Sequence, residues 1–268
     1  MNDRAIAPVI GVMLILAVGV TFFSVYMTTY LPALKQQAEI GHLREVETGI
    51  MRFSSDVDNA ILAGKQSGRG GTLSEQVRLG GGAFLLNPLE SSGTIRIIEN
   101  DTFALIVTTG GSVEHRFDST LVNLSYQPSN NFWIDQGYTW QNGYVVTTKG
   151  VRSAPLQYVS QDELRERAAE FVNDLVAVYS DNGSDISIDT VSLSAGPANV
   201  TSGNGMARIS LDSDVTREYF TGCTNLSYER FDTSAPFNGT IPKTVTVVNY
   251  TIPVNITVKK VNIVLETV

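Results

Sequence analysis

The stretch IAPVIGVMLILAVGVTFFSVYMTTYLPAL, residues 6–34, contains no Asp, Glu, Lys, Arg or His. As a helix, these 29 residues would be ~43 Å long, and a bilayer core ~30 Å thick needs only ~20 residues. A secretory signal has an apolar core of about 7–15 residues and a small-residue cleavage site. This run is about twice as long and lacks such a site at its end. We therefore expect it to remain in the mature protein and to be able to span a membrane.

Two interpretations fit this segment. In the first, it is a single-pass anchor that holds an extracytoplasmic receptor or ligand-binding module at the membrane, and hydropathy alone favours this role. In the second, it assembles with copies of itself outside the membrane. A long apolar helix is unstable alone in water, and each buried CH₂ group contributes ~0.8 kcal/mol to such packing. The residues at the very start of the chain bear on this choice.

The run RAIAPVIGV, residues 4–12, resembles the start of archaeal type IV pilins and pilin-like proteins, which are related to archaellins. The resemblance implies that residues 1–5 are a leader, a class III signal peptide, cut between Ala5 and Ile6 by a prepilin peptidase. It also implies that pilus assembly machinery draws the mature chain from the membrane into a filament. The fifth mature residue would be Ile10 and not the Glu of bacterial pilins, so we expect no charge pairing there.

Small and apolar residues form one narrow face of this helix. Ala7, Gly11, Ile15 and Gly19 are spaced four residues apart, which predicts close approach of a neighbouring helix along that face. Small residues also pack helices together inside bilayers. The face therefore does not distinguish the anchor from the filament.

Beyond residue 34, apolar residues continue at helical spacing, three or four positions apart, which predicts an amphipathic helix. They are Leu43, Val46, Ile50, Phe53, Val57 and Ile61. Pro32 stands between the apolar and the amphipathic halves and predicts a bend, because proline disrupts a helix interior. Residues 6–66 are thus expected to form one long, bent helix that ends at the glycine-rich residues 64–71.

From residue 67 onward, apolar residues recur at every second position, as in a strand, and no longer at every third or fourth position, as in a helix. Short strands are expected at 73–79, 83–86, 94–99, 103–109, 112–117 and 121–126. A hairpin is expected from 138–140 to 144–148, because Asn142-Gly143 between aromatic and β-branched residues favours a tight turn.

The capping-box pattern of residues 160–163 predicts a helix, although residues 172–179 also fit a strand. Strands are expected at 186–193 and 207–211. Ser213-Asp214 is expected to cap a short turn that runs through Tyr219-Phe220, and the tail 243–265 is expected to form two strands separated by Pro253. Many short strands between turns are typical of a sandwich. The predicted fold class is α+β, in which a long N-terminal helix carries an extracellular, mainly antiparallel β-sandwich-like head of residues 67–268.

Composition argues against several functions. The formal charge of −8 and the pI near 4.8 do not suit nucleic-acid binding. Cys223 is the lone cysteine, so the chain has no internal disulfide, and we interpret it as a buried apolar residue. With only His42 and His115 as histidines, neither a metal site nor a hydrolase site is predicted. We expect no enzyme activity and no cofactor.

Eight Asn-x-Ser/Thr sites occur, all from residue 100 onward, and they predict that at least some carry sugar on a head outside the cell. They are Asn100, Asn123, Asn182, Asn199, Asn225, Asn238, Asn249 and Asn255. Glycans there would protect a Thr-rich surface from proteases and from edge-to-edge strand pairing.

Aromatic residues cluster between positions 132 and 144. They are Phe132, Trp133, Tyr138, Trp140 and Tyr144. A surface for adhesion or for stacking on sugars is one interpretation, but core packing and cross-strand aromatic pairs are favoured.

The sequence therefore predicts a non-enzymatic subunit of a surface filament. It would be membrane-inserted before assembly, would pack with copies of itself, and would make cell contact or adhesion through the head. A membrane-anchored receptor is the alternative.

Overall fold

The structure is a computed structural model of the chain of 268 residues. It describes residues 6–81, 91–110, 112–129, 134–149, 152–156, 161–181, 185–231 and 243–268. The strand expected at 83–86 lies outside these ranges.

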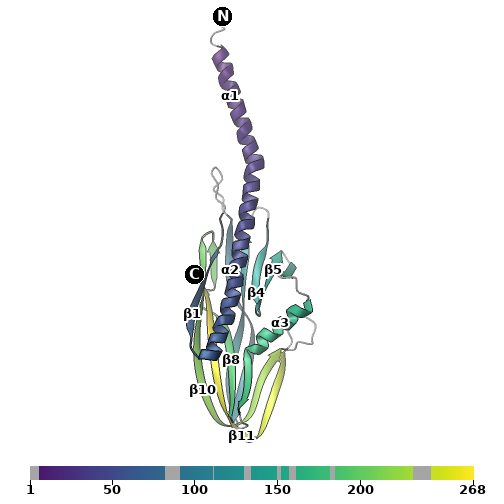
Figure 1. Cartoon of the computed structure of the whole chain (residues 1–268), viewed down its shortest axis with the longest axis vertical. Coiled ribbons are helices and arrows are strands. Elements are labelled where there is room, and N and C mark those ends of the chain that lie inside the picture. The colour runs from purple at the N-terminus through teal and green to yellow at the C-terminus, as the bar shows by residue number, and fades with distance from the viewer. Residues whose placement is uncertain are drawn as a thin grey trace.

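One long helix forms the N-terminal part of the molecule and projects from the head (Figure 1). It comprises α1 (Ile6–Val25), the π-helical segment η2 (Tyr26–Tyr30) and α2 (Leu31–Ser67). The long helix and its packing against a mainly antiparallel sheet confirm the predicted α+β class. Figure 1 also shows that the helix is gently bowed along its length.

The π-helical segment lies immediately before Pro32, where the sequence predicts a bend. Pro32 has no N–H, and in a regular α-helix its ring would crowd the carbonyl of Thr28, four residues earlier. The backbone N–H of Leu31 donates to the carbonyl of Tyr26, five residues back. The chain therefore widens by one π-turn and then continues as α2 without breaking.

The apolar stripe of α2 is buried against the head. All six residues predicted for that stripe are at most 8% exposed. The helix ends at Gly68, which has a left-handed conformation (φ +60°) and donates its N–H to the carbonyl of Gly64 at 3.1 Å. Glycine adopts that conformation without a Cβ clash, so the glycine-rich stop has a defined geometry.

The head contains β1–β11 and a second helix. The strands are β1 (Gly71–Arg78), β2 (Ser92–Thr109), β3 (Val113–Ser129), β4 (Gly137–Gln141), β5 (Tyr144–Lys149), β6 (Arg152–Pro155), β7 (Val176–Asp181), β8 (Asp185–Ala195), β9 (Val200–Gly203), β10 (Met206–Phe231) and β11 (Lys243–Thr267), with α3 (Gln161–Asp174) before β7. They are hydrogen-bonded in the order β6-β5-β4-β3-β2-β10-β11-β8-β7, with β1 on β10 and β9 on β2. The β11–β8 pair is parallel, and the other pairs are antiparallel.

The long strands β10 and β11 fold this sheet over on itself. The first half of β10 pairs with β1 and its second half pairs with β2, and the register shifts between Phe220 and Asn225. Gly222 has a φ of +65° at this bend. The fold brings β3 opposite β8, where the hydroxyls of Ser119 and Thr190 lie 3.2 Å apart. The head is therefore a two-layer arrangement made from a single folded sheet.

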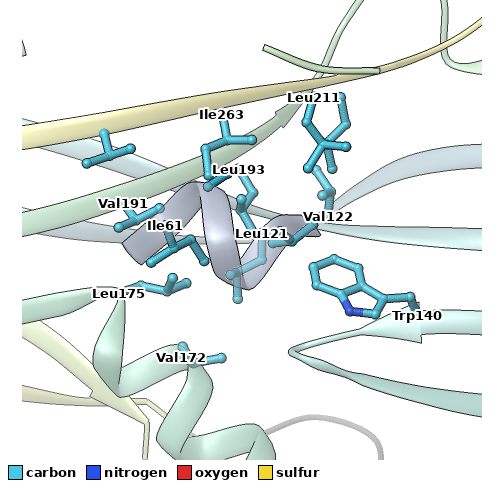
Figure 2. Close-up of a cluster of buried hydrophobic side chains, with 14 of the residues drawn as sticks. Ile61, Leu121, Val122, Trp140, Val172, Leu175, Val191, Leu193, Leu211 and Ile263 are labelled. Atoms are coloured by element: carbon cyan, nitrogen blue, oxygen red, sulfur yellow. The ribbon is translucent and has the colours of Figure 1, made fainter. Parts of the chain in front are cut away.

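The core lies where α2 and α3 meet both halves of the sheet (Figure 2). In Figure 2, Ile61 of α2 lies beside Val191 of β8 and Leu175, while Trp140 of β4 lies on the other side of the helix. The indole of Trp140 packs edge-on against the ring of Phe53, with 5.4 Å between the ring centroids, and its N–H donates to the Ser54 hydroxyl at 3.0 Å. The head thus packs around the second half of the long helix.

Several predicted strands are too short, because the predictions divide strands that are continuous in the structure. The pairs of short strands at 94–109 and 112–126 are the single strands β2 and β3, and the two strands of the tail are the single strand β11. Ser213-Asp214 lies inside β10 and forms no turn. Residues 161–174 are helical and residues 176–181 are a strand, so both interpretations of that segment hold in part. The Asn142-Gly143 hairpin is confirmed, with φ values of +47° and +80°.

Candidate assembly helix and head surface

From Val9 onward α1 is apolar on every side, apart from the hydroxyls of Thr21 and Ser24, and it projects away from the head (Figure 1). From Val9 to Val25 the large apolar side chains are 51–75% exposed. The described helix from Val9 to Ser67 contains a window long and apolar enough to cross a membrane, and that window is not buried by the rest of the molecule. A helix with this pattern is stable only inside a membrane or among other apolar surfaces.

The predicted packing face lies within α1. Ile15 is among the exposed residues, and a Cβ built on Gly11 or Gly19 would have no atom within 4 Å, so this face is open to a neighbour. Ile6 and Ala7 both belong to α1. Ala5, the other side of the predicted cleavage bond, lies outside the described residues.

A shallow hollow on α1 was not predicted. It measures about 320 Å³ and is lined by Ala17, Val18, Thr21, Phe22 and Val25. Small residues four positions apart, Ala17 and Thr21, are the signal that could have revealed it. The Thr21 hydroxyl donates to the carbonyl of Ala17 at 2.8 Å, so it needs no partner from outside the helix. This polar group can therefore be buried in an apolar environment at little cost.

Where the helix enters the head, its buried stripe begins with polar residues. Lys35, Glu39 and His42 are buried, and they extend the spacing of the apolar stripe toward the N-terminus. His42 Nε2 lies 2.9 Å from the hydroxyl of Tyr126, and a Glu39 carboxylate oxygen accepts the N–H of Ile134. Their spacing of three or four residues continues that of the stripe, but their polarity conceals their burial in the sequence.

At the other end of α2, charged side chains join the helix to the sheet. Lys259 of β11 pairs with Asp189 of β8 at 3.1 Å and also donates to the backbone carbonyl of Lys65. Lys65 in turn donates to the carbonyl of Asp174, at the end of α3. Cations at a helix C-terminus interact favourably with its exposed carbonyls. The long helix is thus fixed to the head at both ends of α2.

The predicted aromatic cluster belongs to the core where the structure describes it. Tyr138, Trp140 and Tyr144 are 1%, 0% and 8% exposed, so they cannot form an adhesion surface. This corrects the surface interpretation for these three residues and agrees with the favoured core interpretation. Phe132 and Trp133 lie outside the described residues.

The glycosylation candidates differ in accessibility. Asn100, Asn199, Asn249 and Asn255 are exposed, whereas Asn123 and Asn225 are half-buried. Asn182 and Asn238 lie outside the described residues. The side-chain oxygen of Asn123 is buried and has no hydrogen-bond partner among the described residues, so its amide points into the protein.

In the described part of the chain, the cysteine and histidine side chains do not form a nucleophilic or metal-binding site. Cys223 is buried, and burial raises the pKa of its thiol, which lowers its reactivity. The ring of His115 packs on Phe220 with 4.5 Å between centroids. Among the described residues, no three His, Cys, Asp or Glu side chains come together as a metal site would require.

Comparisons with known proteins identify no relative: no family model, no curated protein and no solved structure matches the chain. The class of protein must therefore be inferred from the architecture. A long apolar N-terminal helix followed by a β-sheet domain is consistent with a pilin-like architecture and indicates membrane insertion or secretion.

Proposed function

We propose that this protein is the structural subunit of an archaeal type IV pilus-like surface filament, with no enzymatic activity. The observation that carries the proposal is the exposure of the apolar side chains of α1 from Val9 to Val25, while one side of α2 is buried against the head. The N-terminal part of a continuous helix is thus left for contacts with other molecules. Twelve large apolar side chains there, each contributing about 1.5–3 kcal/mol when fully buried, favour packing among copies strongly.

The N-terminal sequence supports this role over a permanent anchor. Its resemblance to archaeal pilins implies that the mature chain starts at Ile6. In the proposed cycle, the helix first spans the membrane, the prepilin peptidase removes residues 1–5, and the assembly machinery transfers the helix into the filament core. The head then lies on the outside, where it mediates adhesion and cell contact.

The test is the N-terminal residue of the protein sheared from the cell surface, read by mass spectrometry of its first peptide. A chain that begins at Ile6, together with filaments seen by electron microscopy, supports the proposal. A chain that begins at Met1 and stays with membranes supports the alternative, a single-pass membrane-anchored receptor or ligand-binding module.

A further inference from the structure

Part of the sheet face that carries α2 continues beyond the end of that helix. Figure 1 shows β8, β10 and β11 extending past the last turn of α2. The helix ends over a row of register partners, Arg217, Lys259 and Asp189, and Lys259 there donates to the carbonyl of Lys65. Side chains two residues further along each strand lie on the same face. The next row is therefore the first that α2 does not cover.

This next row, here called the tyrosine row, consists of Tyr219, Thr257, Ser187 and Tyr179. They are register partners across β10, β11, β8 and β7. Tyr219 is 72% exposed and Tyr179 is 53% exposed, and Ser187 is exposed between them. Three steps of about 4.8 Å between strands separate the two tyrosines by about 14 Å.

Polar groups border the tyrosine row on both sides. Toward the helix lies Arg217, which is exposed. On the opposite side lie Asp185 and Asn255, which are exposed and linked by a hydrogen bond of 3.0 Å from the Asn255 amide. The surface thus combines two aromatic rings with hydroxyl, amide, carboxylate and guanidinium groups.

We propose that the tyrosine row is a binding surface for an extended polysaccharide of neutral pyranose rings. The C–H face of a sugar ring packs on the face of an aromatic ring, and vicinal sugar hydroxyls both donate to and accept from hydroxyl, carboxylate and guanidinium groups. The two tyrosines contact separate rings of the same chain, while Ser187 and Thr257 bind the hydroxyls between them.

The chemistry of the row favours sugar over other partners. The centre of a stable protein interface is apolar and depleted of charge, whereas here the centre holds two hydroxyl residues. A membrane-binding surface needs aliphatic side chains with clustered Lys and Arg, and the row supplies neither. The inference rests on the proposed function only in requiring the head to be outside the cell, and it names the ligand class of the adhesion surface.

The test is co-sedimentation of the full-length protein, in filaments or in detergent micelles, with insoluble β-glucan, mannan and chitin particles. We expect the wild type to sediment with at least one polysaccharide. Tyr179→Ala and Tyr219→Ala should each reduce the bound fraction about ten-fold, while Tyr179→Phe and Tyr219→Phe retain binding. Ile252→Ala is the matched control, since Ile252 is 77% exposed on β11 outside the row.

Failure of this inference is distinguishable from failure of the proposed function. Filaments that form normally but sediment with none of the polysaccharides overturn the inference alone. Equal binding by the wild type and both alanine variants also overturns it. If the alanine variants stop assembling while Ile252→Ala assembles, and no polysaccharide binds, the row is a contact between subunits. Binding by a protein that never forms filaments supports the inference and contradicts the filament.

Discussion

The side-chain amide of Asn225 in β10 donates to the side-chain oxygen of Asn249 in β11 at 2.7 Å, which joins two glycosylation candidates across one pair of strands. Sugar is attached to the asparagine nitrogen. In the folded head, the nitrogen of Asn225 is engaged and half-buried, while Asn249 is exposed. The two sites are therefore chemically different, although their sequence patterns are equivalent.

We accordingly expect sugar on Asn249 and not on Asn225, as read by mass spectrometry of glycopeptides from the surface protein. Thr251→Val is the control, because it removes the acceptor pattern but keeps the Asn225–Asn249 hydrogen bond. It should remove the glycan from Asn249 and leave Asn225 without sugar. Sugar found on Asn225 with Asn249 bare would contradict the assignment.

Gly64 permits the close approach of α2 to β11, and its replacement is predicted to destabilise the head. A Cβ on Gly64 would lie 2.6 Å from a methyl of Val261, which is fully buried. Overpacking of this kind costs about 1–3 kcal/mol, which exceeds or cancels the helix propensity gained from alanine, ~1 kcal/mol. Gly64→Ala should thus lower, or at best not raise, the urea midpoint of unfolding of the full-length chain in detergent.

Gly41 is the matched control, because it lies in the same helix with no atom within 4 Å of a built Cβ. Gly41→Ala should raise the midpoint through propensity alone. The second-site change Val261→Ala should relieve the clash in Gly64→Ala, at the cost of its own lost contacts. Equal increases in Gly64→Ala and Gly41→Ala would show that the helix and strand can separate freely.

The head is predicted to lose stability in alkaline solution. Burial, followed by the nearby Glu47 carboxylate, raises the pKa of Tyr138 from 10.0 to about 12. Above pH ~10, Tyr138 ionises in the unfolded chain but stays protonated in the folded one, so unfolding releases a proton. Stability should therefore fall as the pH rises from about 10 to about 12, by up to about 3 kcal/mol.

Urea unfolding at about pH 9 and about pH 11 measures this loss, with tyrosine ionisation followed by ultraviolet absorbance. In Tyr138→Phe the part of the pH dependence due to this residue should disappear. Equal pH dependence of the midpoint in the wild type and in Tyr138→Phe would show that the hydroxyl of Tyr138 ionises as readily in the head as in water.

The sequence predicts the long helix and the stripe of α2 because both depend on spacing within one segment. The Asn142-Gly143 hairpin is likewise local. The predicted strand at 207–211 ends too early, because Ser213-Asp214 is a common turn signal but lies inside β10. The tail is divided in error at Pro253, which usually breaks a strand but here lies next to the bend that folds the sheet. That fold depends on pairing between distant segments, which spacing along the chain does not encode.

The candidate surfaces likewise differ in how far the sequence predicts them. The apolar surface of α1 is evident from composition, whereas its hollow beside Ala17 and Thr21 was not predicted. The tyrosine row was not predictable, because Tyr179 and Tyr219 come together only through the register of four strands, one of them parallel. Core packing of the cluster around Trp140 was the favoured prediction, but the helix that buries Trp140 comes from far upstream and could not be identified from the local sequence.

The ion pair between Lys259 and Asp189 is predicted to matter for stability, because both side chains are largely buried. Lys259→Met leaves the Asp189 carboxylate without its cation and the carbonyl of Lys65 without its donor, which costs about 3–5 kcal/mol. The double variant Lys259→Met/Asp189→Leu should recover much of this loss in thermal unfolding. Arg116→Ala provides the exposed comparison, since its pair with Asp118 is 60% and 61% exposed and worth about 0–1 kcal/mol.

Substitutions in the hollow of α1 distinguish the filament role from the membrane-anchor role. Ala17→Leu fills the hollow and holds a neighbouring helix away, so filaments seen by electron microscopy should be lost or sharply reduced. Val18→Leu is the matched control, because Val18 lines the same hollow and already carries a branched side chain. Leucine suits a bilayer as well as alanine or valine does, so both variants should still insert in the membrane. If α1 serves only as an anchor, the two substitutions will leave the amount and location of the protein equally unchanged.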